Sequence, residues 1–129
     1  MAIRFQPEHD ITASAGAPTV AFDLDGVLAL HGPREKESGE IGKPISSMIK
    51  KLKEFLAAGY NVVVFSARLG QGDRREITRE IGNWTMKHIG VRLPVTDVKS
   101  ADWECFFDDK AVQVIRNSGM TVTEALTKR

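Results

Sequence analysis

The chain has 129 residues and a formal net charge of +1, with 42% hydrophobic and 27% charged residues, values ordinary for one globular domain. This charge balance singles out neither nucleic acid nor an acidic membrane surface, and no apolar stretch is long enough to span a bilayer. Cys105 is the single cysteine, which excludes an internal disulfide, disfavours a cysteine-based zinc site and fits a reducing, cytoplasmic setting. Residues 1–17 lack the apolar core of a signal peptide, so we expect a lead-in followed by a domain over 18–129.

The first elements alternate between strand and helix patterns. An apolar run over 19–24 predicts a buried strand, and 30–44, rich in glycine and charge, is expected to be a long loop. Apolar residues at helical spacing over 45–56 predict a helix that begins near Pro44 and is ended by Gly59. A second buried strand is expected over 61–65.

The second half continues the alternation. Residues 66–72 are expected to be an exit loop, and Asp73 is a suitable N-cap for a helix that Gly90 ends. A short strand over 91–95 and a buried strand over 104–107 are expected next. The remaining predicted elements are a short helix marked by Ala111, Val112 and Ile115 and ended by Gly119, and a last strand over 120–122.

This alternation predicts an α/β fold class: a single Rossmann-like three-layer domain with a mainly parallel sheet and helices on both faces. In such sheets ligands bind at the carboxyl ends of the strands. Polar residues follow three of the predicted strands there: Asp23 and Asp25, then Ser66, then Asp108 and Asp109. Acids gathered at one edge repel one another unless a cation compensates, and Mg²⁺ prefers carboxylate oxygens. Lys99, in the connector before the last acidic strand, offers further positive charge.

Four segments, in order, resemble the motifs of the haloacid dehalogenase-like superfamily of phosphotransferases. They are FDLDG at 22–26, FSAR at 65–68, Lys99, and FFDD at 106–109. The match runs from Val20 to Lys110 and so covers most of the chain. It departs from the family at Leu28, where many members carry threonine.

The resemblance implies a Mg²⁺-dependent phosphomonoester hydrolase. Asp23 would be the nucleophile that forms an aspartyl-phosphate, and Asp25 the general acid and then the base. An acid at the second position favours a phosphatase over a dehalogenase, because a halide needs no proton on leaving. Ser66 and Lys99 would hold the transferring phosphoryl oxygens.

The resemblance also implies the remaining site residues. Mg²⁺ would be held by Asp23, the backbone carbonyl of Asp25, and Asp108, while Asp109 would orient Lys99 or water on the metal. The substrate-binding residues would be Gly26, Ser66, Ala67, Arg68 and Lys99, although a structural salt bridge at Arg68 is an equal alternative.

The segments between the motifs are too short for a cap domain, so the site is expected to be open. His31, Arg34 and Lys36 of the 30–44 segment could reach a substrate or could simply be solvated. The partner is a phosphorylated substrate of unknown identity, with nucleotides, sugar phosphates, nucleic-acid ends and phosphoproteins all open, and no membrane is expected.

Two other functional classes remain: a non-catalytic phosphate- or metal-binding regulatory domain on the same fold, and a response-regulator receiver. A receiver expects its acidic pair after the first strand, whereas here the adjacent pair comes last.

Overall fold

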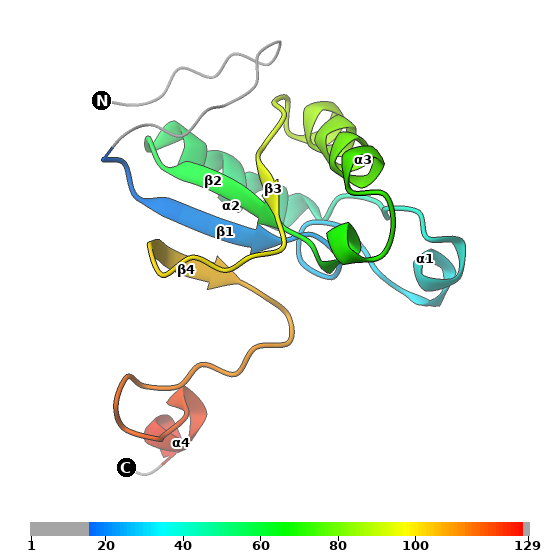
Figure 1. Ribbon diagram of the computed structural model, residues 1–129. Helices are drawn as coiled ribbons and strands as arrows, with labels where there is room; N and C mark the ends of the chain where they lie inside the picture. The colour runs from blue at the N-terminus through cyan, green and yellow to red at the C-terminus, as the bar shows by residue number, and fades with distance from the viewer. Residues whose placement is uncertain (1–15, 128–129) are drawn as a thin grey trace.

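The computed structural model describes residues 16–127 and has a four-stranded, all-parallel sheet with the order β3-β2-β1-β4 (Figure 1). The strands are β1 (Thr19–Asp23), β2 (Asn61–Phe65), β3 (Val95–Thr96) and β4 (Trp103–Phe107). The helices are α1 (Pro33–Ser38), α2 (Ser46–Ala57), the 3₁₀ helix η1 (Ala67–Gly70), α3 (Arg74–His88) and α4 (Val122–Thr127). The predicted α/β class with a parallel sheet is confirmed. The expected lead-in over 1–17 falls outside the described residues except for its last two.

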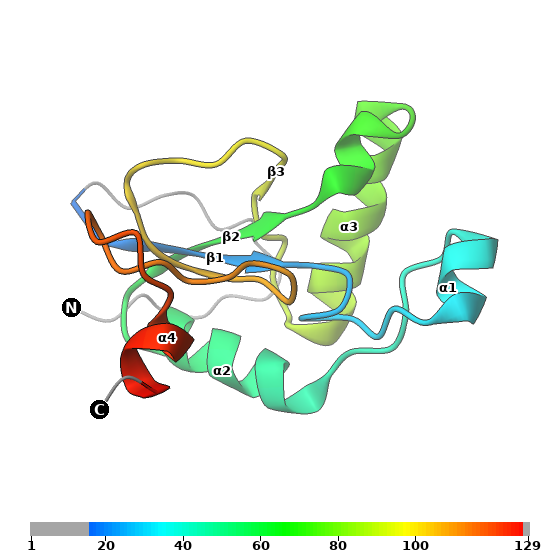
Figure 2. The same cartoon turned by 90° about the horizontal axis from the view of Figure 1, so that it is seen from below.

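One face of the sheet carries the hydrophobic core. Val20 and Phe22 of β1 and Val62 and Val64 of β2 are buried, and the alternation of side chains along a strand puts each pair on one face. The helices α2 and α3 both contribute to this core, through Ile49, Leu52, Leu56, Ile81 and Trp84. Figure 2 shows α2 beneath the sheet and the connection from β3 to β4 crossing on the other side. The α2 and α3 patterns were readable because each has an apolar stripe at helical spacing.

The opposite face carries aromatic side chains. Phe65, Trp103 and Phe106 contact one another, with ring centroids 5.1 to 6.3 Å apart. Asp23 pairs in register with Phe65 and alternates with Phe22, so its side chain belongs to this face. The nucleophile candidate is therefore presented on the side away from the α2 core.

Several predicted boundaries hold. The strand over 61–65 is β2, and the helix over 45–56 is α2, which starts one residue later at Ser46. Asp73 caps α3 as expected, because its carboxylate accepts hydrogen bonds from the backbone N–H groups of Arg75 and Glu76.

The 30–44 segment is not simply a loop, because it contains α1. Pro33 stands at the start of this helix, where its missing N–H costs nothing, and Glu35 accepts a hydrogen bond from the Gly32 N–H. Gly39 ends it with a φ of 76°. The helix has no buried residue, so it lacks the apolar stripe by which helices are recognised in a sequence.

The strand predicted over 91–95 is also corrected, since β3 is only Val95–Thr96. Val91 and Leu93 are buried in the core instead of forming a ladder, and Pro94 has no N–H to donate to one.

The C-terminal region differs most from expectation. The predicted helix around Ala111–Ile115 and the predicted strand over 120–122 are both wrong: 110–121 is irregular, with a turn at 116–118 and one antiparallel bridge between Val114 and Thr121, and α4 follows. Asn117 adopts a φ of 61°, which interrupts a right-handed helix. The strand over 104–107 is not buried either, because β4 is an edge strand and Cys105 is exposed.

Candidate functional site

Acidic side chains meet at the carboxyl edge of the two strands β1 and β4. These strands are adjacent and parallel, so Asp23, at the end of β1, lies beside Asp108 and Asp109, which follow β4. Oxygens of the three carboxylates all lie within 4.8 Å of one another, and this is the one such group of potential metal ligands among residues 16–127. The arrangement could hold a divalent cation.

The turn after β1 fixes the geometry of the first motif. Leu24 and Leu28 are fully buried, and the Leu24 carbonyl accepts hydrogen bonds from the N–H groups of Leu28 and Ala29 at 3.0 and 2.9 Å. Gly26 has a φ of +87°, and a Cβ atom there would collide with the carboxylate of Asp109. The turn therefore needs glycine both for its backbone and to let the end of β4 approach the end of β1.

The pKa of Asp23 lies well above the usual value for an aspartate. Burial and the neighbouring Asp108 raise the pKa of Asp23 from 3.8 to about 7, with smaller contributions from Asp109, while a hydrogen bond from the Leu24 N–H opposes the rise. A cation among these oxygens would reverse the shift by favouring the charged carboxylate. The donors are all oxygens, the type that a hard cation such as Mg²⁺ accepts.

Asp25 faces a different partner. Arg68 forms a bidentate ion pair with it, from Nε to Oδ2 at 2.7 Å and from Nη2 to Oδ1 at 3.0 Å. His31 Nδ1 lies 3.5 Å from Oδ1. The side chain of Asp25 therefore binds Arg68 and is not part of the three-aspartate cluster. The expectation that Asp25 helps to hold a metal concerns a different atom, its backbone carbonyl, and stays a prediction.

Ser66 is buried rather than open to a ligand. Its Oγ accepts a hydrogen bond from the Arg68 N–H and caps η1, and its own N–H bonds to the Thr96 carbonyl. Its successors Ala67 and Arg68, together with Phe65, line the cavity over the acids.

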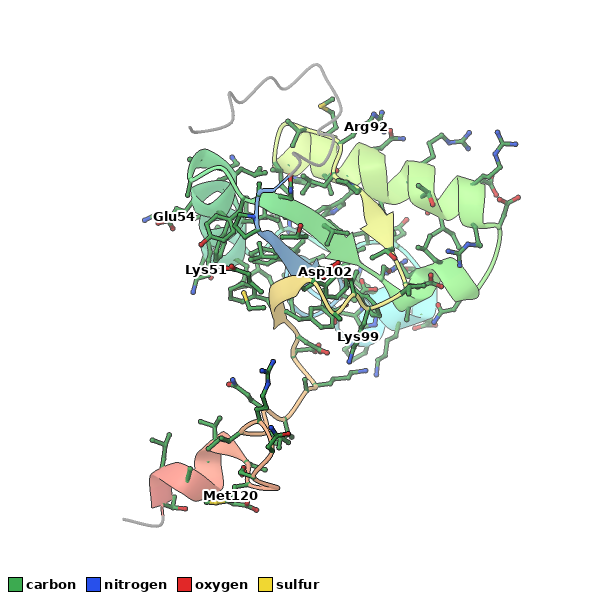
Figure 3. All side chains as sticks on the ribbon, turned by 60° about the vertical axis from the view of Figure 1, so that its left-hand side comes forward. Lys51, Glu54, Arg92, Lys99, Asp102 and Met120 are labelled. Atoms are coloured by element: carbon green, nitrogen blue, oxygen red, sulfur yellow. The ribbon has the colours of Figure 1, made fainter. Side chains whose placement is uncertain are left out.

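The lysine expected for the third motif, Lys99, is not among the residues that line the acidic cavity. Lys99 is exposed on the connection between β3 and β4 (Figure 3), with its Nζ 5.8 Å from the ring centroid of Phe106. A different lysine, Lys110, lines the acidic cavity. The position of Lys110 directly after Asp109 could have marked it as a site residue. The motif comparison considered only Lys99.

The acidic cavity has a volume of about 630 Å³ and is built from four segments. Its aspartates come from the ends of β1 and β4, while Arg68 and Gln71 come from η1 and its cap. The 30–44 segment contributes His31, Glu35, Lys36 and Gly39. Arg34, the third candidate of that segment, is exposed and does not line it.

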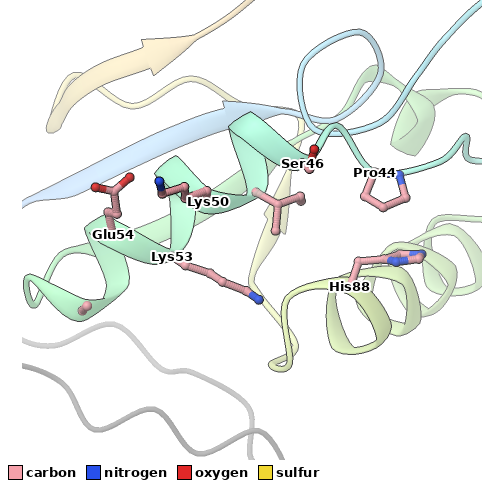
Figure 4. Close-up of a pocket in the computed structure, with 8 residues that line it drawn as sticks. Pro44, Ser46, Lys50, Lys53, Glu54 and His88 are labelled. Atoms are coloured by element: carbon pink, nitrogen blue, oxygen red, sulfur yellow. The ribbon is translucent and has the colours of Figure 1, made fainter.

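A second cavity, of about 580 Å³, lies between α2 and the end of α3 (Figure 4). Its polar lining includes Lys50, Lys53, Glu54 and His88. Among the described residues, none that lines this cavity belongs to a cluster of potential metal ligands. The His88 ring packs on Trp84 at 4.7 Å, and burial lowers the pKa of His88. This cavity lacks the convergent reactive groups that the strand edge has.

Comparisons with models of protein families, with curated proteins and with solved structures found no match for this chain. Across residues 16–127, none of the helices has the length and apolar character needed to cross a membrane.

Proposed function

We propose that this protein is a Mg²⁺-dependent phosphomonoester hydrolase of the haloacid dehalogenase-like type, acting through an aspartyl-phosphate on Asp23. The observation that carries the proposal is the meeting of Asp23, Asp108 and Asp109 at the carboxyl edge, with Asp25 two residues beyond the first of them. The order and spacing of the motifs support it independently of the geometry.

In this proposal the reaction divides between Asp23 and Asp25. The ionised carboxylate of Asp23 attacks phosphorus, and the leaving oxygen takes a proton from Asp25. Asp25 then accepts a proton from the water that hydrolyses the acyl phosphate, which frees Asp23 and releases phosphate. Each oxygen of Asp25 accepts one hydrogen bond from Arg68 and keeps a second lone pair, on which Asp25 can carry the proton.

Asp23, Asp108 and the backbone carbonyl of Asp25 would hold Mg²⁺, with Asp109 close enough to contribute or to orient its other ligands. The cation would supply the positive charge that allows an anionic nucleophile to approach an anionic phosphate. Lys110 lines the same cavity, so it is a candidate for the role first expected of Lys99 at the phosphoryl oxygens.

The test is hydrolysis of a panel of aryl and alkyl phosphates, with and without Mg²⁺. We expect metal-dependent turnover that Asp23→Asn reduces by at least about a thousandfold, because removing a nucleophile removes the covalent route. The matched control is Asp102→Asn, which changes an exposed aspartate on the β3–β4 connection. Equal, near-zero turnover by the wild type and Asp23→Asn across the panel would contradict the proposal.

A second candidate is a regulatory domain that binds a cation or phosphate without catalysis. The ion pair that engages both oxygens of Asp25 favours it, because these contacts also suit a carboxylate whose role is to hold the fold together. This candidate predicts Mg²⁺ binding by calorimetry with no turnover of any ester in the panel.

A further inference from the structure

We propose that Arg68 is a positioning residue, not a phosphate ligand: it aims the carboxylate of Asp25 and holds the 30–44 segment over the acidic cavity. The part that concerns catalysis rests on the proposed function. The part that concerns the 30–44 segment does not.

The guanidinium of Arg68 is almost fully engaged by the protein. Besides its two bonds to Asp25, its Nη1 donates to the Gly39 carbonyl at 2.6 Å and its Nη2 donates to the Glu40 carbonyl at 3.2 Å. These four hydrogen bonds leave one of the five guanidinium N–H groups for any other ligand. The side chain is only 15% exposed. A bidentate grip on phosphate would require breaking bonds that are already made.

The 30–44 segment depends on such bonds because it has little burial of its own. The helix α1 has no buried residue. The base of the segment is closed by the Leu30 N–H bond to the Lys43 carbonyl and by Trp84 Nε1, which donates to the Gly42 carbonyl. The two carbonyls that follow α1 are bound by Arg68, which reaches them from η1, more than twenty-five residues away in sequence. Arg68 therefore connects the 30–44 segment to the FSAR motif at 65–68 through hydrogen bonds.

The consequence for the cavity is direct. His31, Glu35 and Lys36 line it from the 30–44 segment, so the position of the segment determines the shape of the space above the acids. The Arg68 side chain therefore both orients the carboxylate of Asp25 and fixes the segment that forms one wall of the cavity.

The test compares Arg68→Lys with Arg74→Lys. Lysine keeps the charge but cannot reproduce the planar, multi-donor geometry of arginine. Arg74 is the matched control, because it forms an equally bidentate ion pair, with Asp97 at 2.8 and 3.0 Å, and does not line the cavity.

The first measurement is amide hydrogen exchange of peptides covering 31–42. In Arg68→Lys we expect exchange there to be faster by about tenfold or more, the effect of losing charge-assisted hydrogen bonds, with peptides of α2 and β2 unchanged. Arg74→Lys should leave 31–42 unchanged. If Arg68→Lys raises exchange throughout the chain, Arg68→Gln, which keeps an amide donor, is the second variant. Unaltered exchange at 31–42 in a folded Arg68 variant overturns the proposal, whether or not the protein is an enzyme.

The second measurement is kinetic. If Arg68 aims the general acid, Arg68→Lys should lower kcat/KM, which reports transfer of the phosphoryl group to Asp23, about tenfold or more for alkyl phosphates but by less than about threefold for nitrophenyl phosphate, whose leaving group needs little protonation. Inhibition by inorganic phosphate should stay within about twofold. Weaker inhibition by phosphate with an equal loss for all esters would instead identify Arg68 as a phosphate ligand and overturn the proposal. An inactive wild type would refute the proposed function, and hydrogen exchange would still decide whether Arg68 holds the segment.

Discussion

At the scale of single residues, two aspartates that are chemically identical and two positions apart have different surroundings. Asp23 lies among like charges and has a raised pKa, whereas Asp25 lies against a guanidinium. The sequence motif alone does not distinguish them. The difference in partners supports different roles, with Asp23 suited to contact a cation and Asp25 to exchange a proton with a reacting oxygen.

The raised pKa of Asp23 predicts how stability depends on pH. Without metal, the folded state retains a proton on Asp23 up to a pKa of about 7, against 3.8 when unfolded, so its stabilising contribution is complete below pH 3.8 and is lost as pH rises through about 7. Mg²⁺ competes with that proton, and we expect it to raise the Tm more at pH 8 than at pH 5. Thermal unfolding in EDTA and in Mg²⁺ at both values, for the wild type and Asp23→Asn, measures this. A Mg²⁺ effect that is equal at both pH values, or that persists in Asp23→Asn, would contradict it.

Gly26 gives a second prediction at this scale. Gly26→Ala places a side chain at a φ of +87° and against the Asp109 carboxylate, which should cost roughly 1–3 kcal/mol of folding free energy and displace Asp109. Chemical denaturation checks the stability, and calorimetric titration with Mg²⁺ should show weaker binding. The control is Gly70→Ala in η1, where no heavy atom lies within 4 Å of the added carbon, and it should behave as the wild type.

At the scale of elements, α2 is the helix whose packing supports the turn after β1. Leu52 is completely buried in the same core as Leu24 and Leu28. Leu52→Ala should therefore reduce the free energy of unfolding by about 2–5 kcal/mol, the range for a leucine removed from a core. Urea denaturation is the measurement. A loss below about 1 kcal/mol would show that this core is not closely packed.

The elements also show how far the sequence was informative. The strand of β2, the α2 stripe and the Asp73 cap were predictable because apolar periodicity and capping chemistry are local signals. The helix α1 was not, since none of its residues is buried, and neither was the irregular segment 110–121, whose apolar residues Val112, Val114 and Ile115 are exposed. A pattern of apolar residues predicts burial only where the chain has something to bury them against.

The candidate site, like the elements, was only partly predictable from the sequence. That the ends of β1, β2 and β4 share one edge follows from parallel strands, so the meeting of Asp23 with Asp108 was predictable. A structural salt bridge at Arg68 was one of two alternatives that the sequence left open, and the structure contains it. Its partner, Asp25, and the presence of Lys110 in the cavity were not predictable, because they depend on side-chain directions that spacing does not encode. The roles of these residues in catalysis remain predictions.

At the scale of the whole molecule, the stabilising core lies within residues 20–93, while the C-terminal region contributes little to it. The helix α4 has no buried residue, and Leu126 is 61% exposed. Leu126→Ala should change the free energy of unfolding by less than about 0.5 kcal/mol, in contrast to Leu52→Ala. Urea denaturation of both variants makes the comparison, and a cost at Leu126 similar to that at Leu52 would mean that α4 packs on a partner surface in solution.

The whole molecule has only a short insertion beside the acidic cavity. Between β1 and α2 the insertion consists of α1 and its flanking residues, and no separate cap domain is present among the described residues. The charged groups that reach the cavity from this insertion are His31, Glu35 and Lys36. Selection among phosphorylated substrates would then fall to this short segment.

In the proposed mechanism, Asp23 carries a phosphoryl group during turnover. Incubation with substrate and Mg²⁺, rapid quenching and borohydride reduction would convert an acyl phosphate on an aspartate into homoserine, which peptide mass spectrometry can locate. We predict homoserine at position 23 in the wild type, increased in Asp25→Asn, where hydrolysis of the intermediate is slowed, and dependent on both substrate and Mg²⁺. Phosphate release with no homoserine at position 23, or with homoserine at another aspartate, would contradict this mechanism.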